Sequence, residues 1–415
     1  MALNYIWISF FVISFFVAIV KTILGDTEVF SLVTTKLFES TKIGFEISLG
    51  LTALMAFWLG IMNIADKSGL IKKSSNLLAP FFSKLFPEVP KESPAYGNMM
   101  MNFSANMLGL DNAATPLGLK AMNDLQNLNH QKTVASKAMI MFLVINTAGI
   151  TLIPTSVMAI RQTMAIEQGL VGFNAADIFL PTLMVTYCTL FFAIIAVAWY
   201  QKLNLLNIPF IAFNLFFIGI IAGMYFWIKQ FPQEAIAGKI ALIGSILIFG
   251  IIVVIIISGA IKKINVYDTF IDGAKDGFKT AVQIIPYLIA ILAAIAVFNA
   301  TGCLNFITDG IGNIVRLLGF DDKFIPALPV GLMKTLSGSG ARAFMVDLMH
   351  NYGVNSFQGN LASIMQGSTE TTFYVLAVYF GSVGIKNAKS AVIFGLLADI
   401  VGIVIAIAVG YLFYG

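Results

Sequence analysis

The chain has 415 residues, of which 58% are hydrophobic and only 11% are charged. About a quarter of the residues in an ordinary soluble domain are charged, so this composition excludes that class and indicates a membrane protein. The formal net charge of +4 is too small to indicate nucleic-acid binding, and no nucleic-acid partner is expected.

Apolar runs of about 20 residues, the length that crosses the hydrocarbon core of a bilayer, recur along the whole chain. They predict membrane spans near 3–24, 44–65, 138–160, 177–200, 207–228, 240–261, 280–300 and 390–412, with a weaker ninth near 360–384. The first run has no basic segment before it and no cleavage pattern after it, so we expect a retained helix and not a signal peptide.

Lysines and arginines are distributed unequally over the loops between these spans. If Met1 is cytoplasmic and 96–125 is a re-entrant segment, the cytoplasmic segments carry 15 Lys and Arg and the opposite side carries eight, Arg161 among them. The positive-inside rule therefore favours a multi-pass protein of the cytoplasmic (inner) membrane with a cytoplasmic N-terminus.

Two stretches of the sequence, about 43–200 and about 276–412, repeat the same order of features. Each opens with Gly-Phe at the start of an apolar span and continues with an amphipathic stretch, a proline-bearing turn and two polar interruptions. Five crossings separate the two starts, and an odd number inverts the second unit. The prediction is an all-α polytopic membrane protein with two inverted repeats, re-entrant hairpins and broken helices, divided into halves 1–205 and 206–415.

The polar interruptions supply the expected substrate-binding residues. Helix ends at membrane depth leave backbone groups unpaired, which is tolerated only where they face protein or a watery cavity, and secondary transporters bind solutes at such breaks. Repeat symmetry brings the interruptions to one midplane site, for which we expect Asn102, Asn106, Asp111, Asn112, Thr115, Asn146, Thr147, Thr151, Ser337, Ser339, Arg342, Gln366, Ser368, Thr369, Glu370 and Thr371.

Glu370 lies in an otherwise apolar and hydroxyl-rich span, where a carboxylate is costly unless it is paired, hydrated or protonated. One hypothesis is that it holds the coupling ion, either Na⁺ or H⁺. The alternative is a structural ion pair with Arg342 or Lys334. Asp399 leaves a similar choice open, between ion coupling and helix packing.

The same motifs carry a resemblance to known families. The run 102–122 with 146–154 resembles spore maturation protein A, and the runs 336–341, 365–374 and 379–385 resemble spore maturation protein B. Together the two resemblances cover roughly 1–205 and 235–412. These families are grouped with the nucleoside-recognition, or gate, domains of concentrative nucleoside transporters, which implies a transporter-like core without fixing the solute.

Two classes of function remain open after this resemblance. The first is a secondary transporter of a small polar solute, nucleoside-like or other, with no cofactor unless Na⁺ is the coupling ion. The second is a non-transporting membrane protein of spore maturation or envelope development. An enzyme is not expected, because the sequence lacks the H-E-x-x-H and G-x-S-x-G motifs, and two histidines with Cys188 and Cys303 predict no metal site. The expected partners are the solute and the bilayer, and a homo-oligomer is left open.

Overall fold

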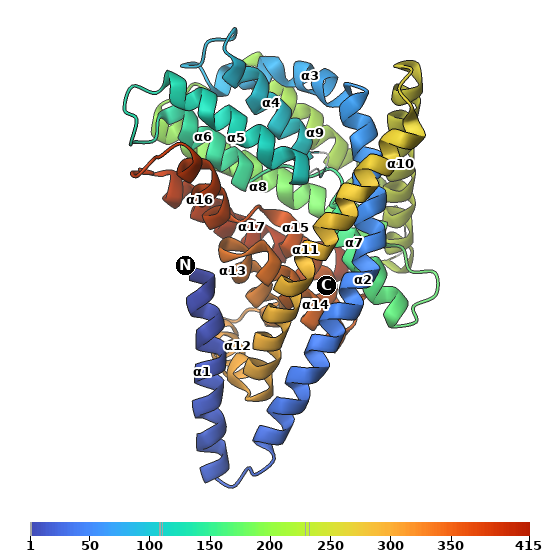
Figure 1. The fold of residues 1–415 in the computed structure, drawn as a ribbon, viewed down its shortest axis with the longest axis vertical. Helices are drawn as coiled ribbons and strands as arrows, with labels where there is room; N and C mark the ends of the chain where they lie inside the picture. Colours follow the sequence, from blue (N-terminus) through green and yellow to red (C-terminus); the bar gives the residue numbers. More distant parts are fainter. Residues whose placement is uncertain (1, 108, 110, 229, 232) are drawn as a thin grey trace.

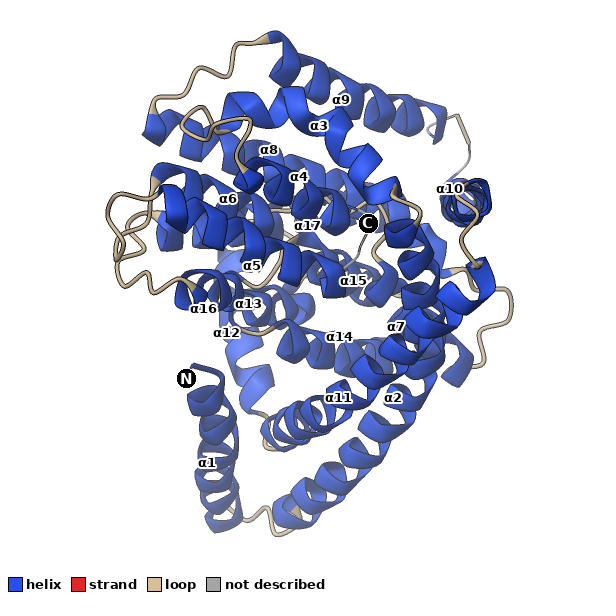
Figure 2. Cartoon of the chain, turned by 45° about the horizontal axis from the view of Figure 1, so that its top comes forward, coloured by secondary structure: helices blue, strands red, loops and turns tan. Residues whose placement is uncertain are grey.

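The computed structural model describes residues 2–107, 109, 111–228, 230–231 and 233–415. Helices make up most of this part of the chain, and it contains no β-strand (Figures 1 and 2). The predicted all-α membrane fold is therefore confirmed.

The first half of the chain builds one series of helices and then two connecting helices. The series consists of α1 (Ala2–Ile23), α2 (Val29–Lys67), α3 (Leu70–Leu85), α4 (Pro94–Met107), α5 (Asp111–Leu128), α6 (Lys137–Thr147), α7 (Thr155–Glu167), the short 3₁₀ helix η1 (Ala175–Ile178) and α8 (Phe179–Gln201). The connecting helices are α9 (Ile208–Ile228) and α10 (Gln233–Ile261).

The second half repeats the order long helix, amphipathic helix, hairpin, broken helix and final span. Its elements are α11 (Val266–Ala300), α12 (Cys303–Leu317), η2 (Ile325–Ala327), α13 (Leu328–Leu336), α14 (Gly338–Tyr352), α15 (Phe357–Ser368), α16 (Thr372–Ser382) and α17 (Ala391–Tyr414). In this order α11 corresponds to α2, α12 to α3, α13–α14 to α4–α5, α15–α16 to α6–α7 and α17 to α8.

The long helix of each repeat ends at a glycine in the left-handed backbone conformation. Gly69 has φ 76° between α2 and α3, and Gly302 has φ 79° between α11 and α12. Glycine adopts this conformation without the penalty that a Cβ atom would impose, so the chain turns into its amphipathic helix at the same point of each repeat.

The long helices α2 and α11 cross side by side in antiparallel directions (Figure 1). A Cβ atom on Gly44 would lie 3.3 Å from Cγ1 of Ile289, and one on Gly277 would lie 2.6 Å from Cα of Ala56. Gly277 follows Gly44 by 233 positions, and Ile289 follows Ala56 by the same 233. The repeat therefore maps the Gly44–Ile289 contact onto the Gly277–Ala56 contact. A pseudo-twofold axis between inverted units requires this equivalence.

The final helices α8 and α17 are also antiparallel. The ring of Tyr200 near the end of α8 packs against Phe394 near the start of α17, with centroids 5.3 Å apart. At the other end of the pair, the Tyr414 hydroxyl donates to the carbonyl of Asp177 at 3.4 Å. A second pair of corresponding helices thus has the opposite orientations that inverted repeats predict.

Among the described residues, four helices are long and apolar enough to cross a membrane: 175–201, 208–227, 238–261 and 391–414. They match the predicted spans 177–200, 207–228, 240–261 and 390–412. The predicted span 3–24 is α1, while 44–65 and 280–300 are the last parts of the longer helices α2 and α11.

The predicted spans 138–160 and 360–384 are each a broken helix, as the polar interruptions in them predict. The helix stops after Thr147 and restarts at Thr155, and its counterpart stops after Ser368 and restarts at Thr372. Pro154, which has no N–H, precedes the first restart. The polar interruptions predicted in these segments coincide with the two breaks.

The re-entrant segments are helical hairpins. In the first, α4 and α5 fold back on each other, with Asn98 donating to Asp124 at 2.7 Å and Asn102 donating to the carbonyl of Ala114 at 2.7 Å. In the second, Ser337 alone separates α13 from α14 and caps α14 by accepting the Gly340 N–H at 3.0 Å. Three of the four arms, α4, α13 and α14, have 14, 9 and 15 residues and are too short to cross the membrane. The fourth, α5, has 18 residues but is not among the helices apolar enough to span it.

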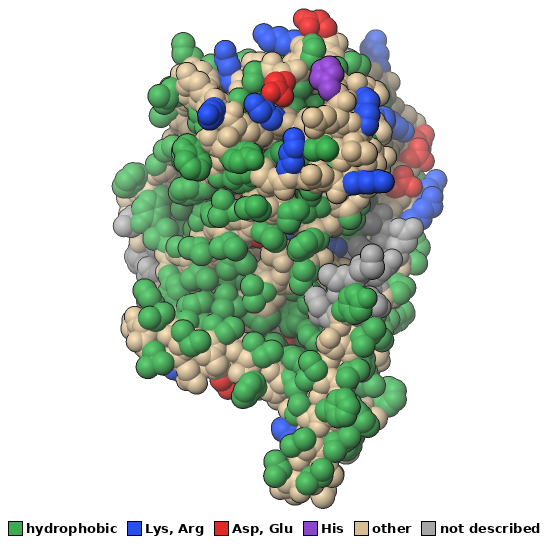
Figure 3. Space-filling view, turned by 90° about the vertical axis from the view of Figure 1, so that its left-hand side faces the viewer, with side chains coloured by type: hydrophobic (Ala, Val, Ile, Leu, Met, Phe, Trp, Pro, Cys, Tyr) green, Lys and Arg blue, Asp and Glu red, His purple; other side chains and the backbone are tan. Residues whose placement is uncertain are grey.

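Basic side chains gather at one end of the molecule, beside a broad apolar band (Figure 3). The loops around 88, 133 and 387 meet in one region, because Lys137 pairs with Glu88 at 3.7 Å and the Ala135 N–H donates to the carbonyl of Asn387 at 3.0 Å. The predicted topology places these three loops on one side of the membrane, and the structure brings them together.

The inverted arrangement predicts that Lys91, after α3, and Asp309, on α12, face opposite sides of the membrane. Both residues are exposed. In a background without Cys188 and Cys303, we expect an impermeant maleimide to label Lys91→Cys from one face only and Asp309→Cys from the other. Labelling of both positions from the same face would contradict the inversion.

The α2–α11 crossing predicts a large effect for a small substitution. A Cβ atom on Gly273 would lie 2.4 Å from the carbonyl oxygen of Leu59 and 2.6 Å from Cβ of Asn63. We expect Gly273→Ala to lower the free energy of unfolding by about 1–3 kcal/mol, measured by denaturation in detergent. The matched control is Gly250→Ala on α10, where nothing lies within 4 Å, so its stability should be equal to wild type or higher.

Candidate functional site

The two helix breaks and the two hairpin ends surround one small polar cavity of about 70 Å³. The hairpins contribute one set of lining residues and the broken helices contribute the rest. The described lining residues are Gly109, Lys334, Gly338 and Arg342 from the hairpins, and Gly149, Thr151, Ile153, Pro154, Thr155, Ser156, Val157, Gln366, Gly367, Thr369 and Glu370 from the broken helices.

The end of the first hairpin is held by the first break. The Leu152 N–H donates to the carbonyl of Met107 at 2.8 Å, and the Thr155 hydroxyl donates to the carbonyl of Gly109 at 3.4 Å. Gly109 has φ 74°, and a Cβ atom there would lie 2.2 Å from the carbonyl oxygen of Ile153. The hairpin end can approach this closely only because the residue is glycine.

The second hairpin contacts the second break in a similar way. Gln366 donates its side-chain N–H to the carbonyl of Gly338 at 3.4 Å. A Cβ atom on Gly338 would lie 3.0 Å from the hydroxyl oxygen of Thr371. Each hairpin end therefore rests on the break of its own repeat.

The two breaks also contact each other and the final helix of the first repeat. The Glu370 N–H donates to the carbonyl of Thr147 at 2.7 Å. The Thr151 N–H donates to the hydroxyl of Thr186 on α8 at 3.3 Å. Backbone groups freed by the breaks are thus paired inside the protein, which is the condition for irregular backbone at membrane depth.

A buried network of amides and one phenol connects the first hairpin to both broken helices. Asn106 donates to the side-chain oxygen of Asn146 at 2.9 Å, and the Tyr379 hydroxyl donates to the same oxygen at 3.3 Å. Asn102 completes the chain by donating to the Tyr379 oxygen at 3.3 Å. Gly118 makes room for this phenol, since a Cβ atom there would lie 2.1 Å from the hydroxyl.

Three charged side chains line the cavity without pairing with each other. Lys334 is only 6% exposed, and Nε of Arg342 is buried without a hydrogen-bond partner. Among the described residues, no Lys or Arg nitrogen lies within 4.0 Å of a Glu370 oxygen. Glu370 therefore does not form the structural ion pair with Arg342 or Lys334 that was the alternative to a coupling role.

The structure sorts the predicted site residues into several groups. Thr151, Arg342, Gln366, Thr369 and Glu370 line the cavity. Those in the adjacent amide network or in the breaks and caps around the cavity are Asn102, Asn106, Asn146, Thr147, Ser337, Ser339, Ser368 and Thr371. Thr115 lies on α5 away from the cavity lining, and the side chains of Asp111 and Asn112 lie outside the described residues.

Sequence reasoning left Lys334, Thr155, Ser156 and Tyr379 out of the expected site. The sequence does contain a reason to include Lys334 in the site. It lies three residues before a Ser-Gly-Ser-Gly turn predicted at membrane depth, where a lysine is costly in lipid. Thr155 and Ser156 follow Pro154 at a helix start, a position that exposes free N–H groups. Tyr379 opens the run 379–385 that carries part of the resemblance, but it lies outside the polar interruptions from which the site residues were predicted.

Asp399 is 1% exposed on α17 and accepts a hydrogen bond from the Thr372 hydroxyl at 2.6 Å. Its other carboxylate oxygen is buried without a partner among the described residues. A Cβ atom on Gly395, one turn earlier, would lie 2.7 Å from Cγ2 of Thr372. Asp399 thus anchors the start of α16 to α17 directly behind the second break.

Arg161, counted among the eight basic residues on the side opposite the cytoplasm, is not a solvated loop residue. Its side chain is completely buried and donates to both carboxylate oxygens of Asp177 at 3.0 Å. It also donates to the Ser363 hydroxyl at 2.9 Å. The ion pair joins α7, η1 and α15, and the excess of basic residues on the other side of the membrane persists without Arg161.

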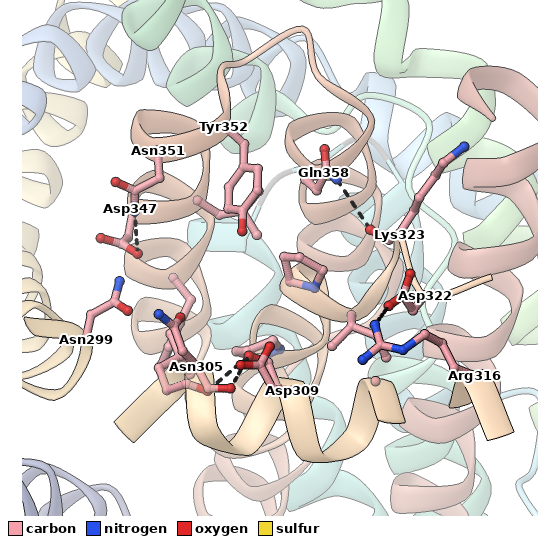
Figure 4. Close-up of a pocket in the computed structure, with 18 residues that line it drawn as sticks. Asn299, Asn305, Asp309, Arg316, Asp322, Lys323, Asp347, Asn351, Tyr352 and Gln358 are labelled. Carbon is pink, nitrogen blue, oxygen red and sulfur yellow. Dashed lines mark hydrogen bonds and ion pairs between the residues drawn. The ribbon is translucent and has the colours of Figure 1, made fainter. Parts of the chain in front are cut away.

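A larger pocket of about 640 Å³ lies between α12, α14 and the start of α15 (Figure 4). The polar face of α12 lines it with Asn305, Asp309 and Arg316, whereas the apolar face is exposed, with Phe306 at 82% and Leu317 at 85%. The helix α12 thus turns its polar face to the pocket and its apolar face away from it.

In the first repeat, described side chains of α3 and its C-terminal end pack inward. There α3 packs the aromatic rings of Phe81, Phe82 and Phe86 into the core, and the ring of Phe82 meets Phe103 of α4 at 5.2 Å. The two repeats share a backbone plan but differ in how tightly the amphipathic helix covers the hairpin.

The gate family profile, described as nucleoside recognition, matches residues 48–164 and 281–386. The chain belongs to this family. The two matched segments fall within the two repeats, on the long helices, hairpins and broken helices that surround the cavity. The family and the helical membrane fold are not enzyme-like.

Two curated relatives each match part of the gate protein. Spore maturation protein B of Bacillus subtilis is 46% identical over 165 residues, which are 40% of this chain and 91% of the relative. Spore maturation protein A of the same organism is 42% identical over 183 residues, which are 44% of this chain and 87% of the relative. These matches are consistent with a fusion, and no solved structure matches the chain.

The buried ion pair predicts a strong asymmetry between charge substitutions. Asp177→Ala leaves the Arg161 guanidinium buried without its carboxylate, so we expect a loss of about 3–5 kcal/mol in the free energy of unfolding. The control is Glu39→Ala, which removes an exposed partner of Lys36 and should cost about 0–1 kcal/mol. Equal unfolding midpoints for the two variants in detergent would contradict the structural role of the pair.

Proposed function

We propose that this gate-family protein is a secondary transporter of a small polar solute in the cytoplasmic (inner) membrane. One observation carries the proposal: four interruptions, a hairpin end and a helix break from each of two inverted repeats, surround a single polar cavity. Inverted repeats with broken helices at a shared site are the architecture of secondary transporters. No catalytic activity is assigned to the site.

The size of the cavity supports a closed state of such a transporter. A volume of about 70 Å³ holds roughly two water molecules, whereas ligand pockets usually measure about 300–1,000 Å³. A nucleoside-sized solute therefore requires the cavity to widen. The polar pocket of about 640 Å³ beneath α12 gives the second hairpin free space in which to move.

Glu370 is the proposed coupling group. It is the acidic residue among the described lining residues, and its carboxylate forms no ion pair with a described residue. A carboxylate in this position can take a proton or hold Na⁺ when the solute binds. The proposed orientation places the N-terminus, α3 and the loops around 88, 133 and 387 in the cytoplasm, where their lysines satisfy the positive-inside rule.

The second candidate is a non-transporting membrane protein that acts in spore maturation or envelope development. The names of the two relatives favour it. Uptake by vesicles reconstituted with the purified full chain separates the candidates, using a panel of neutral, anionic and cationic solutes under Na⁺ and proton gradients. Uptake above that of empty vesicles supports transport, and no uptake of any solute under either gradient supports the second candidate.

For a transported solute, we expect Glu370→Gln to abolish uptake against a gradient while solute exchange at equilibrium continues. The physical reason is that glutamine keeps the shape and hydrogen bonds of the side chain but cannot carry the coupling charge. Glu92→Gln, an exposed loop substitution of the same chemistry, should leave both activities unchanged.

The fold of the Glu370→Gln variant is checked by its unfolding midpoint in detergent. Normal uphill uptake by the folded variant would refute the coupling role. Unfolding would instead assign Glu370 a structural role.

A further inference from the structure

Two cationic side chains and one acidic side chain are found among the described residues that line the cavity. Lys334 and Arg342 both line it, and Glu370 supplies the one negative charge among the described lining residues. Lys334 is 6% exposed and interacts electrostatically with the buried Asp399 carboxylate, but it forms no salt bridge within 4.0 Å with a described residue. A lysine this deeply buried without a salt bridge is costly, so the position favours a ligand that supplies negative charge.

The second cation is similarly under-satisfied. Nε of Arg342 is buried without a hydrogen-bond partner, although a guanidinium has five N–H donors in a fork that fits a carboxylate or a phosphate. Arg342 lies on α14, on the same hairpin as Lys334 of α13, and both groups border the same cavity.

Two helix starts add to the positive potential. The helix α7 has 13 residues and starts at Thr155, and α14 has 15 residues and starts at Gly338; both starts line the cavity. A helix start presents free N–H groups and the positive end of the helix dipole, which favour anions. The helix starts and the two buried cations act on the same small volume.

We infer that the cavity binds a compact oxyanion group of the solute, a carboxylate or a phosphate, between Lys334 and Arg342. The cavity volume of about 70 Å³ suits such a group and not a whole nucleoside. Glu370 stays free for the coupling ion, so solute and ion occupy separate groups of one site. This inference deepens the proposed function and rests on it for its place in a transport cycle.

The test measures binding without transport. Purified full-length protein in detergent is titrated with acetate, inorganic phosphate, methylammonium and uridine at constant ionic strength. We expect saturable binding of acetate or phosphate, and the one that binds more tightly identifies the oxyanion. Lys334→Gln should weaken this binding about ten- to a hundredfold, the effect of losing one charged hydrogen bond.

The controls separate charge from folding. Lys334→Arg keeps the charge and should restore most of the affinity, and Lys386→Gln in an exposed loop should bind like the wild type. If Lys334→Gln does not fold, the inference is tested by the wild-type protein alone, through its preference for acetate or phosphate over methylammonium and uridine. Binding of neither acetate nor phosphate, or tighter binding of uridine or methylammonium, overturns the inference.

The outcomes also separate this inference from the proposed function. Binding of an oxyanion by a protein that transports nothing in vesicles would reject transport and leave the anion site standing. Uptake of a neutral solute by a protein that binds neither oxyanion would reject the anion site and leave transport standing.

Discussion

The need to pair backbone groups wherever a helix stops inside the membrane shapes the centre of this protein. Neither lipid nor bulk water can satisfy those groups there, so protein must do it. The Glu370 N–H bonds to the carbonyl of Thr147, and the Leu152 N–H bonds to that of Met107. The breaks and hairpin ends are therefore held against one another, and the space left between them is necessarily small and polar.

The two inverted repeats contribute equivalent backbone elements to this arrangement, but their side chains differ. The first repeat fills the space under its amphipathic helix with phenylalanine rings, while the second leaves a polar pocket beneath α12. Among the described residues that line the central cavity, the charged ones, Lys334, Arg342 and Glu370, belong to the second repeat. A shared backbone plan thus combines a half whose amphipathic helix packs phenylalanine rings inward with a half that has a polar pocket and charged lining residues.

Buried charge follows two different rules in the same molecule. The pair Arg161–Asp177 is bidentate and supported by Ser363, so it holds α7, η1 and α15 together as a structural unit. Lys334 and Arg342 form no salt bridge with a described residue, although Lys334 is only 6% exposed and Nε of Arg342 is buried. The paired charges thus join the helices around the second break, whereas the charges without a salt bridge line the cavity.

The sequence by itself determined the features that depend on neighbouring residues: the helical class, the positions of the interruptions, the glycine turns and the inversion that follows from counting spans. Only the tertiary structure decided which polar groups meet, because the partners are far apart in the chain. Tyr379 and Asn146 are separated by 233 positions, and no local pattern connects them. Likewise, composition identified Arg161 and Lys334 as charges near the membrane, but packing alone paired the first and left the second facing the cavity.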